Sequence, residues 1–530
     1  MPRTIGRILK WVLVALLVIG VALLVLRSFR VLGGPPLQPW HTFVPQELRA
    51  DQLDAADWSH YLAREDEIMA SVRAEVSQKL APDQRVPINR YFEASPVYPA
   101  RFAHDWNRSY VMEPDGKPVG VVVLLHGLTD SPYSLRHIAR HYRDQGYLAI
   151  GIRLPAHGTV PAGLTDVRWE DWMAATRLAV REARRRVPAP APLHLAGFSN
   201  GGALAMKYSL DALESPQLPR ADRVVLFTPM IGITRFARFA GLASLPALLP
   251  PFANAAWLSV IPEFNPFKYN SFPVNGARQS FRLTDALQAQ IQRMARAGSL
   301  GALPPVLTFQ SVIDFTVSTP AILTALYANL PDNGSEIVLF DVNRTLKFTP
   351  LLRPASFVAI DRLAPTEPVT YRFTAIANAN SNANDNSEAT VERSIAPGQL
   401  QAAVRPLNLP YPVGIFSLSH LAIPIPMDDP LYGMDPDPKT KDDYGYNLGA
   451  MDARGERGAL IVDQDFLTRL SSNPFFPYLL ERIDGEISRP SSPSGRNIAT
   501  TVAPGLPVRI EAVLSTLLPG DEGLQPFAGP

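Results

Sequence analysis

A glycine-flanked serine offers the clearest chemistry in this sequence. Ser199 stands in GFSNG at residues 197–201, after an apolar run and before the helix-favouring segment 203–210. A serine at the tip of a tight strand-to-helix turn exposes its hydroxyl above a sheet, and small flanking residues let neighbouring segments approach. This context predicts that Ser199 is a nucleophile. The alternative is a glycine-rich turn that contains an incidental serine.

Short apolar runs alternate with amphipathic segments on both sides of this motif. We expect six of the runs to be buried parallel strands because their apolar residues are nearly continuous. These runs are residues 119–125, 147–152, 193–196, 224–227, 306–309 and 337–340. Helical periodicity occurs at 135–142, with Gly146 as its stop, and from about 166 to 183. The alternation predicts a doubly wound, mostly parallel α/β sheet.

Four motifs appear in a fixed order: VVVLLHGL at 121–128, RLPAHGT at 153–159, WEDW at 169–172 and GFSNG at 197–201. Together they resemble the carboxylesterase and monoacylglycerol-lipase branch of the α/β-hydrolase superfamily. The resemblance covers roughly residues 119–341 and resumes around residue 420. It implies the α/β-hydrolase fold and a serine hydrolase. The family's usual PGHG reads PAHG here, a change in a structural turn.

The resemblance implies a catalytic triad in the chain order serine, acid, histidine. Of the nine histidines only His420 follows Ser199, so His420 is the expected base. The acid should follow the strand at 306–310, where Asp314 stands with the family's Asp-x-x-Val spacing. Competing carboxylates are Asp341 at the end of the next strand, and Asp428 with Asp429 near the histidine. A surface position for Asp314 and a non-catalytic one for His420 remain the alternatives.

A tetrahedral oxyanion needs two backbone donors, which this fold takes from the nucleophile turn and from the first strand-helix loop. By the same resemblance these donors are the N–H groups of Asn200 and Leu128, and their side chains are incidental. The resemblance also makes His126 and His157 residues that shape loops, and neither is expected to be the base.

Composition excludes several other classes of function. Net charge is +1 with a pI near 7.9, so nothing indicates nucleic-acid binding. The absence of cysteine excludes disulfides, thiolate metal sites and cysteine nucleophiles. We therefore expect no metal and no cofactor. The 52 prolines indicate long irregular loops around a smaller regular core.

The first 33 residues have the pattern of a signal anchor. An apolar run extends from Trp11 to Leu26 between basic residues, and Ile8 and Leu9 lengthen it enough to span a bilayer if Lys10 snorkels. A cleaved signal peptide is the alternative, but no Ala-x-Ala site follows the run. We expect a single-pass protein held in the membrane by residues 8–26, with its catalytic domain outside the cytoplasm, in the periplasm if the source is bacterial.

The rest of the chain divides around the hydrolase domain, residues 116–487. Residues 34–115 are expected to be a linker and a helical extension without chemistry. Within the domain, two stretches do not fit the strand-helix rhythm and should lie outside the sheet: an apolar cap at about 232–303 and a second insertion at about 345–409. Residues 488–530, rich in proline, serine and glycine, form a tail.

The second insertion explains an unusual spacing. Asp314 and His420 are 106 residues apart, and the insertion accounts for most of the excess over related enzymes. Its alternating segment 369–376 and asparagine-rich segment 378–386 predict a hairpin with a mobile tip. Because the chain must return to the catalytic residues, we expect the hairpin to overhang the substrate pocket or to project away as an interaction surface.

These patterns predict a membrane-anchored serine hydrolase that cleaves carboxylic esters through an acyl-serine intermediate. The apolar cap and the anchor favour a lipid-like acyl ester. Two alternatives remain: an amidase, peptidase or acyltransferase that uses the same triad, and a non-catalytic binding or scaffolding protein of the cell envelope on a hydrolase fold.

Overall fold

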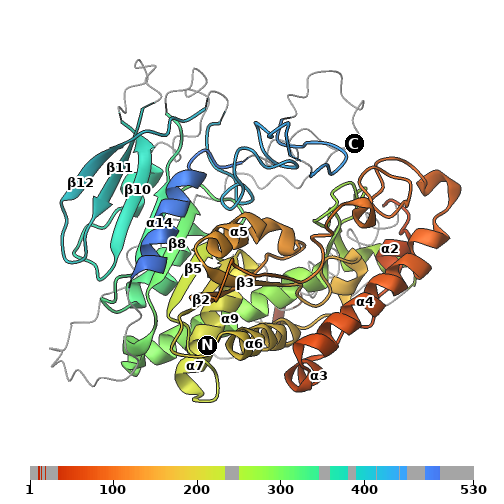
Figure 1. The fold of residues 1–530 in the computed structure, drawn as a ribbon, viewed down its shortest axis with the longest axis horizontal. Coiled ribbons are helices and arrows are strands. Elements are labelled where there is room, and N and C mark those ends of the chain that lie inside the picture. Colours follow the sequence, from red (N-terminus) through yellow and green to blue (C-terminus); the bar gives the residue numbers. More distant parts are fainter. Residues whose placement is uncertain are drawn as a thin grey trace. The chain divides into compact units, whose positions relative to one another are not determined.

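A mostly parallel sheet forms the centre of the molecule (Figure 1). The computed structural model describes residues 34–232, 250–344, 358–379, 389–412, 415–440, 442–450 and 472–489, with positions 10, 11, 14 and 18. Within these residues the main sheet has ten strands in the order β1-β3-β2-β4-β5-β8-β9-β10-β11-β12. Strands β3 to β10 in this order are mutually parallel, whereas β1, β11 and β12 run antiparallel to their neighbours.

The six expected strands are confirmed. They are β2 (Gly120–Leu125), β3 (Tyr147–Ile152), β4 (Leu193–Phe198), β5 (Arg223–Phe227), β8 (Val306–Ser311) and β9 (Glu336–Phe340), and every residue in them is buried. Burial on both faces explains their continuous apolar character. A short strand β1 (Tyr110–Met112) pairs with β3 at one edge, and β6 (Trp257–Ser259) with β7 (Phe272–Pro273) forms a separate two-stranded sheet.

Helices cover both faces of the sheet, and each face has its own hydrophobic core. One face packs against α6 (Trp169–Arg186), α7 (Asn200–Glu214) and α9 (Val274–Arg296). The opposite face packs against α5 (Arg136–Asp144) and α14 (Phe476–Ser488). The expected helices at 135–142 and 166–183 correspond to α5 and α6. The result is a three-layer α/β/α arrangement (Figure 1).

The N-terminal extension is helical, as expected. It contains α2 (Pro39–Thr42), α3 (Ala50–Ala55) and α4 (Trp58–Glu75), and α3 packs against α6. None of the helices in the described ranges is long and apolar enough to cross a bilayer. Apart from four isolated positions, the predicted anchor lies outside these ranges, and so does the tail from residue 490.

The expected cap is shorter than predicted. Residues 274–296 form α9, whose apolar side chains Leu283, Leu287, Ile291 and Met294 recur at helical spacing and are buried in the core beside α7. This helix is the crossover between the parallel neighbours β5 and β8, which a sheet of this kind requires. Only residues 232–273 are therefore extra to the core, and 233–249 of these lie outside the described residues.

The prediction that residues 345–409 lie outside the sheet is wrong. The hairpin exists, but β10 (Arg372–Asn378) pairs in parallel with β9, and β11 (Thr390–Ile395) and β12 (Ala402–Leu407) extend the sheet beyond it. All but the first residue of β10 are buried, because it covers the edge of β9 that would otherwise stay unpaired. The hairpin continues the sheet, so it is not an arm over the pocket; its tip, 380–388, lies outside the described residues.

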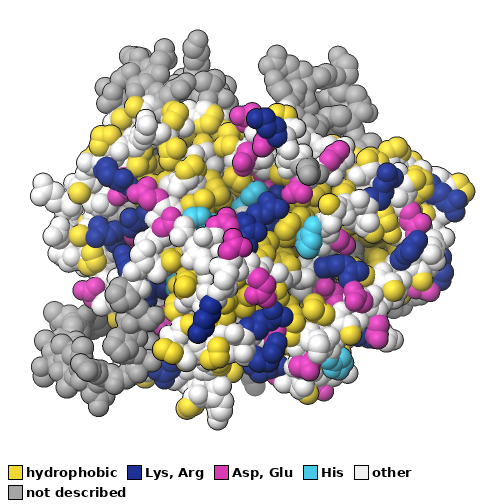
Figure 2. Space-filling model, in the orientation of Figure 1, with side chains coloured by type: hydrophobic (Ala, Val, Ile, Leu, Met, Phe, Trp, Pro, Cys, Tyr) yellow, Lys and Arg dark blue, Asp and Glu magenta, His cyan; other side chains and the backbone are white. Residues whose placement is uncertain are grey.

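Basic and acidic side chains are interspersed on the face of the molecule in Figure 2. This distribution agrees with the small net charge of the chain. No extended patch of a single charge sign is present on that face.

We predict that β10 contributes to the core as an interior strand would. Ile376 is fully buried against the second helix layer, so Ile376→Ala should lower the free energy of unfolding by about 2–5 kcal/mol. Val404 on the outer strand β12 is 61% exposed, and Val404→Ala should change that free energy by less than about 0.5 kcal/mol. Urea denaturation of both variants measures the difference; equal, small effects would mean that the hairpin is a detachable arm.

Candidate active site

Ser199 lies on a strained turn between β4 and α7. Its φ is 53° and its ψ is −115°, a left-handed conformation that is costly for a serine. Backbone hydrogen bonds hold it there: the Ser199 N–H donates to Phe227 O over 2.9 Å, and its carbonyl accepts from the N–H of Gly202 and of Met230. Ser199 therefore lies just beyond the carboxyl end of the interior strand β4, and the residue is 5% exposed.

The two motif glycines are required by close backbone contacts. A Cβ at Gly197 would lie 2.4 Å from Gly201 O, and one at Gly201 would lie 1.9 Å from Leu125 O. Only glycine allows three backbone segments to meet under the serine at these distances. The sequence spacing therefore reflects packing at the turn.

The structure brings together His420 and Asp314, the residues expected to be base and acid. His420 Nδ1 lies 2.8 Å from Asp314 Oδ2, and the Asp314 side chain is fully buried. The other oxygen, Oδ1, accepts from the N–H groups of Thr316 and Val317. Burial alone would raise the pKa of Asp314, but His420 and these hydrogen bonds hold the pKa below its ordinary value. An ionised carboxylate can only accept, so His420 carries its proton on Nδ1.

The chain returns to this position because the insertion begins and ends at the same place. After β9, Asn343 donates from its backbone to Phe416 O over 2.8 Å and from its side chain to Ile415 O over 3.0 Å. Tyr411 donates its hydroxyl hydrogen to Asp341 O. The three added strands thus leave and rejoin at neighbouring residues, which delivers His420 to the end of β8 despite the long separation in sequence.

His420 also lies beside the residues that flank Ser199. Its ring centroid is 5.3 Å from that of Phe198, and its carbonyl accepts from Thr228 Oγ1 at 3.5 Å. In the described residues no hydrogen bond joins His420 Nε2 and Ser199 Oγ. Catalytic hydrogen bonds of this kind often tighten only when a substrate binds.

The expected oxyanion donors lie on the loops that meet at Ser199. A Cβ on Gly127 would lie 3.2 Å from Ser199 Cβ, so the loop that carries Leu128 touches the nucleophile. Asn200 is the first residue of α7, and its side chain accepts from Ser280 Oγ at 2.9 Å. Thr129, at φ 61°, accepts from the N–H of Tyr269 over 2.7 Å. Sequence reasoning missed both supports, Ser280 and Tyr269, because neither stands in a motif.

Residues 116–341 match the family model described as serine aminopeptidase, S33. This core has the α/β-hydrolase fold. A curated relative, the thermostable monoacylglycerol lipase of Bacillus sp. (strain H-257), is 33% identical over 89 residues. The match covers 17% of this chain and 34% of the lipase, so the chain spans about a third of the length of that relative.

Two solved structures are similar to the α/β-hydrolase core. The match to a metagenome-derived lipolytic enzyme has 22% identity and a TM-score of 0.36, and covers 45% of this chain and 88% of that enzyme. The match to a soluble variant of monoglyceride lipase from Saccharomyces cerevisiae has 14% identity and a TM-score of 0.34, and covers 44% of this chain and 81% of the lipase.

The competing carboxylates of the α/β hydrolase are engaged elsewhere. Asp341 Oδ2 accepts from Arg344 at 2.9 Å, and Asp428 is exposed. Asp429 is fully buried and lies 2.6 Å from the guanidinium of Arg136. The same carboxylate accepts from the hydroxyl of Tyr133, and the loop that follows His420 is thereby tied to the start of α5.

His126 and His157 organise loops, as the resemblance implied. His126 Nε2 accepts from the N–H of Leu154 at 3.0 Å, which joins the end of β2 to the loop after β3. His157 Nδ1 donates to Pro155 O at 3.0 Å. Burial lowers the pKa of His157 to about 3 and holds the pKa of His126 well below its ordinary value. Both rings are therefore neutral at pH 7.

A buried charge cluster attaches the N-terminal extension to the α/β-hydrolase core. Arg153, directly after β3, binds both oxygens of Glu47 over 2.7 and 3.0 Å, and its Nε donates to Glu65 over 3.0 Å. Burial by itself would lower the pKa of Arg153, but the two carboxylates hold it well above its ordinary value. The sequence signal for this cluster is an arginine directly after a buried strand, which by itself does not identify the two carboxylates.

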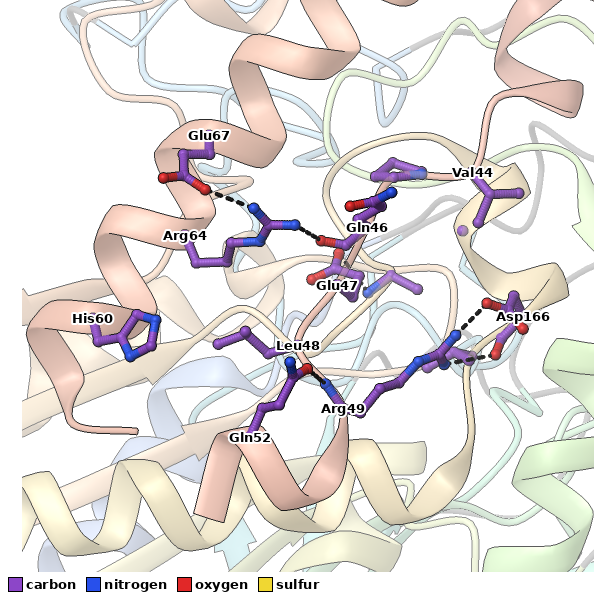
Figure 3. Close-up of a pocket in the computed structure, with 14 residues that line it drawn as sticks. Val44, Gln46, Glu47, Leu48, Arg49, Gln52, His60, Arg64, Glu67 and Asp166 are labelled. Atoms are coloured by element: carbon purple, nitrogen blue, oxygen red, sulfur yellow. Dashed lines mark hydrogen bonds and ion pairs between the residues drawn. The ribbon is translucent and has the colours of Figure 1, made fainter. Parts of the chain in front are cut away.

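A cavity of about 730 Å³ opens beside this cluster, between α4 and the loop at 156–167 (Figure 3). Its walls include Arg64, which pairs with Glu67 at 2.6 Å, and Arg49, which pairs with Asp166. Ser199, Asp314 and His420 do not line it. In the part of the chain that the structure describes, no group of three or more His, Asp or Glu side chains is arranged to hold a metal ion.

We predict that Asp429 stabilises the α/β hydrolase without taking part in catalysis. Asp429→Asn would leave the charge of Arg136 buried and uncompensated, which should lower the free energy of unfolding by about 3–5 kcal/mol at pH 7. Burial opposes ionisation, but Arg136 and His137 hold the pKa of Asp429 below its ordinary value. The stabilisation is therefore present at neutral pH and lost in acid, and the difference should shrink below about pH 4.

Asp428→Asn is the matched control, because Asp428 is the exposed neighbour. Its free energy of unfolding should stay within about 0.5 kcal/mol of the unmodified chain. Denaturant titrations of both variants at pH 7 and at low pH make the comparison. A pH-independent difference, or equal effects at both positions, would contradict the assignment.

Proposed function

We propose that this chain is a serine hydrolase that cleaves carboxylic esters, with Ser199 as nucleophile, His420 as base and Asp314 as the residue that orients it. The hydrogen bond between His420 Nδ1 and Asp314 carries the proposal. It fixes the proton on Nδ1 and leaves Nε2 with a lone pair, the form in which imidazole accepts a proton from serine.

The first half of the reaction forms the acyl-serine. Ser199 Oγ attacks the ester carbonyl carbon as His420 Nε2 takes the hydroxyl proton, and the ionised Asp314 stabilises the resulting imidazolium. The N–H groups of Leu128 and Asn200 would stabilise the negative oxygen of the tetrahedral intermediate. Its collapse breaks the bond to the alcohol oxygen, which leaves with the proton from His420.

The second half consumes water. His420 Nε2 removes a proton from a water molecule, whose oxygen attacks the acyl carbon, and the carboxylic acid leaves as Ser199 recovers its proton. Every proton that moves passes through one imidazole, so the reaction needs no cofactor.

Esters are the favoured substrates, with lipid-like acyl esters preferred. Support comes from the Bacillus relative, which is a monoacylglycerol lipase, and from the apolar composition of residues 232–260. The family description, serine aminopeptidase, keeps amide or peptide cleavage as the alternative reaction of the same triad. Transfer of the acyl group to an alcohol would differ only in the second step, in which an alcohol replaces water.

We further propose that residues 8–26 anchor the enzyme in a membrane and that the catalytic domain lies outside the cytoplasm. The support is the apolar run between basic flanks in the sequence.

Loss of either the nucleophile or the base should abolish turnover. Ser199→Ala and His420→Ala should each lower kcat on a soluble ester by roughly 10⁴- to 10⁶-fold, and the double variant should be no slower, because triad members act as a unit. Steady-state kinetics measure the loss of kcat. Labelling by a fluorophosphonate probe, which should occur in the unmodified chain and be absent in Ser199→Ala, tests the nucleophile separately. A folded Ser199→Ala variant that keeps more than a few per cent of kcat would rule out the nucleophile, and failure of the unmodified chain to label would favour a binding protein on a hydrolase fold.

Matched ester and amide substrates should separate the two reactions. We expect a higher kcat/KM for an acyl ester than for its isosteric amide, and a rise in kcat/KM as the acyl chain lengthens from acetyl. Product analysis with added alcohol detects acyl transfer. Faster cleavage of the amide would assign the chain to the peptidases, and an acetyl preference would contradict a lipid-like substrate.

A further inference from the structure

The first residues of the continuous range that begins at residue 34 lie against the extra segment, 232–273, beside the candidate site. Asn254 Nδ2 donates to Pro35 O over 3.2 Å, and His41 Nε2 lies 3.0 Å from Ser271 Oγ. The His41 ring also packs edge-on against Trp257, with centroids 4.9 Å apart. We call residues 34–42 and 254–271 together the cap wall.

His41 fixes the linker onto this wall. Its Nδ1 accepts from the N–H of Gln38 at 3.0 Å, so Nε2 carries the proton and donates it to Ser271. Ser271 is held in turn, because its N–H donates to the buried carboxylate of Glu263 over 2.7 Å. His41 itself is 5% exposed. The chain that leads to the N-terminus therefore leaves the domain from a defined place.

The cap wall is joined to the candidate site by single hydrogen bonds. Tyr269, in the wall, donates its N–H to Thr129 O in the loop that carries Leu128. Just before the extra segment begins at residue 232, Met230 donates its N–H to Ser199 O over 2.9 Å. The wall thus borders the loop that carries Leu128, and the chain that leads into the extra segment contacts the nucleophile turn.

Chain length limits how far this wall can lie from a membrane. The predicted span ends at Leu26, and the seven residues 27–33 separate it from Gly34. Seven residues reach at most about 25 Å when fully extended. If the span is in a bilayer, the start of the cap wall lies within that distance of its surface.

We propose that the cap wall is the face that this protein turns toward the bilayer holding its own anchor, and that the candidate site takes its ester from that same bilayer. The claim that the ester comes from this bilayer rests on the proposed function and on the predicted anchor. The orientation follows from the docking of residues 34–42 beside the site. The surface of the lipid bilayer contacts the cap wall, and ester lipids from that bilayer are the substrate.

Site-specific labelling tests the orientation directly. The chain has no cysteine, so Leu258→Cys and Val404→Cys each create one labelling site in the full-length protein. Leu258 is 47% exposed on the cap wall, and Val404 is 61% exposed on β12, at the opposite end of the sheet from the extension (Figure 1). In liposomes with an acceptor dye on the lipid headgroups, energy transfer should be several-fold stronger from position 258. Equal transfer, stronger transfer from 404, or failure to float with the liposomes would overturn the proposal.

A second measurement tests the docking. His41→Ala should weaken the preference for position 258, because it frees the linker from Ser271 and Trp257. Thr42→Ala is the control, because Thr42 is exposed and its hydroxyl bonds only to Gln38 O and Pro39 O. An unchanged preference in His41→Ala would show that the linker does not set the orientation.

Activity separates this proposal from the proposed function. A long glycine-serine insertion between Gly33 and Gly34 should lower kcat/KM for an ester lipid in the same liposomes and leave turnover of a water-soluble ester unchanged. Equal activity on the embedded ester would overturn the claim about its source. An unmodified chain that cleaves neither ester would overturn the proposed function, whatever the labels report.

Discussion

The hydrogen bond between His420 and Asp314 sets the geometry that the rest of the domain has to satisfy. A buried carboxylate opposite an imidazole is costly unless both are hydrogen-bonded, so the two loops must meet accurately. The two loops meet although three strands, β10, β11 and β12, lie between Asp314 and His420 in the sequence. Asn343, just after β9, donates to the carbonyl oxygens of Ile415 and Phe416 where the chain returns, so the insertion begins and ends at one place.

The parts of the site that follow from local sequence were predictable, and those that follow from packing were not. The turn at Ser199 requires glycines at 197 and 201 because backbone atoms fill the space of any Cβ, and this leaves a readable motif. Asp314 and His420 could be found because the resemblance implies the chain order serine, acid, histidine, and a single histidine follows Ser199. Ser280 bonds to the side chain of Asn200, and Tyr269 bonds to the loop that carries Leu128. These contacts span 80 and 140 residues, which no local pattern records.

The errors in the fold have the same origin. Residues 369–376 alternate as a strand should, but alternation does not tell which sheet a strand joins. The unpaired edge of β9 decides that question, and β10 covers it. The helix at 274–296 was hidden in an apolar stretch that suggested a cap, although a crossover between β5 and β8 is needed by any parallel sheet. The extension at 34–115 lies outside the family resemblance, yet its Glu47 and Glu65 pair with the buried Arg153 directly after β3.

The added strands move the open edge of the sheet away from the catalytic residues and change its character. The last strand, β12, is exposed along its length, and such an edge can recruit another chain by backbone pairing. Pro406 lies within this strand opposite Val391 and has no N–H to offer, and Arg405 beside it carries a charge that pairs with Glu392. A proline and a charged residue on an edge strand discourage growth of the sheet into aggregates. The insertion thus ends the sheet with a strand that is poorly suited to being extended.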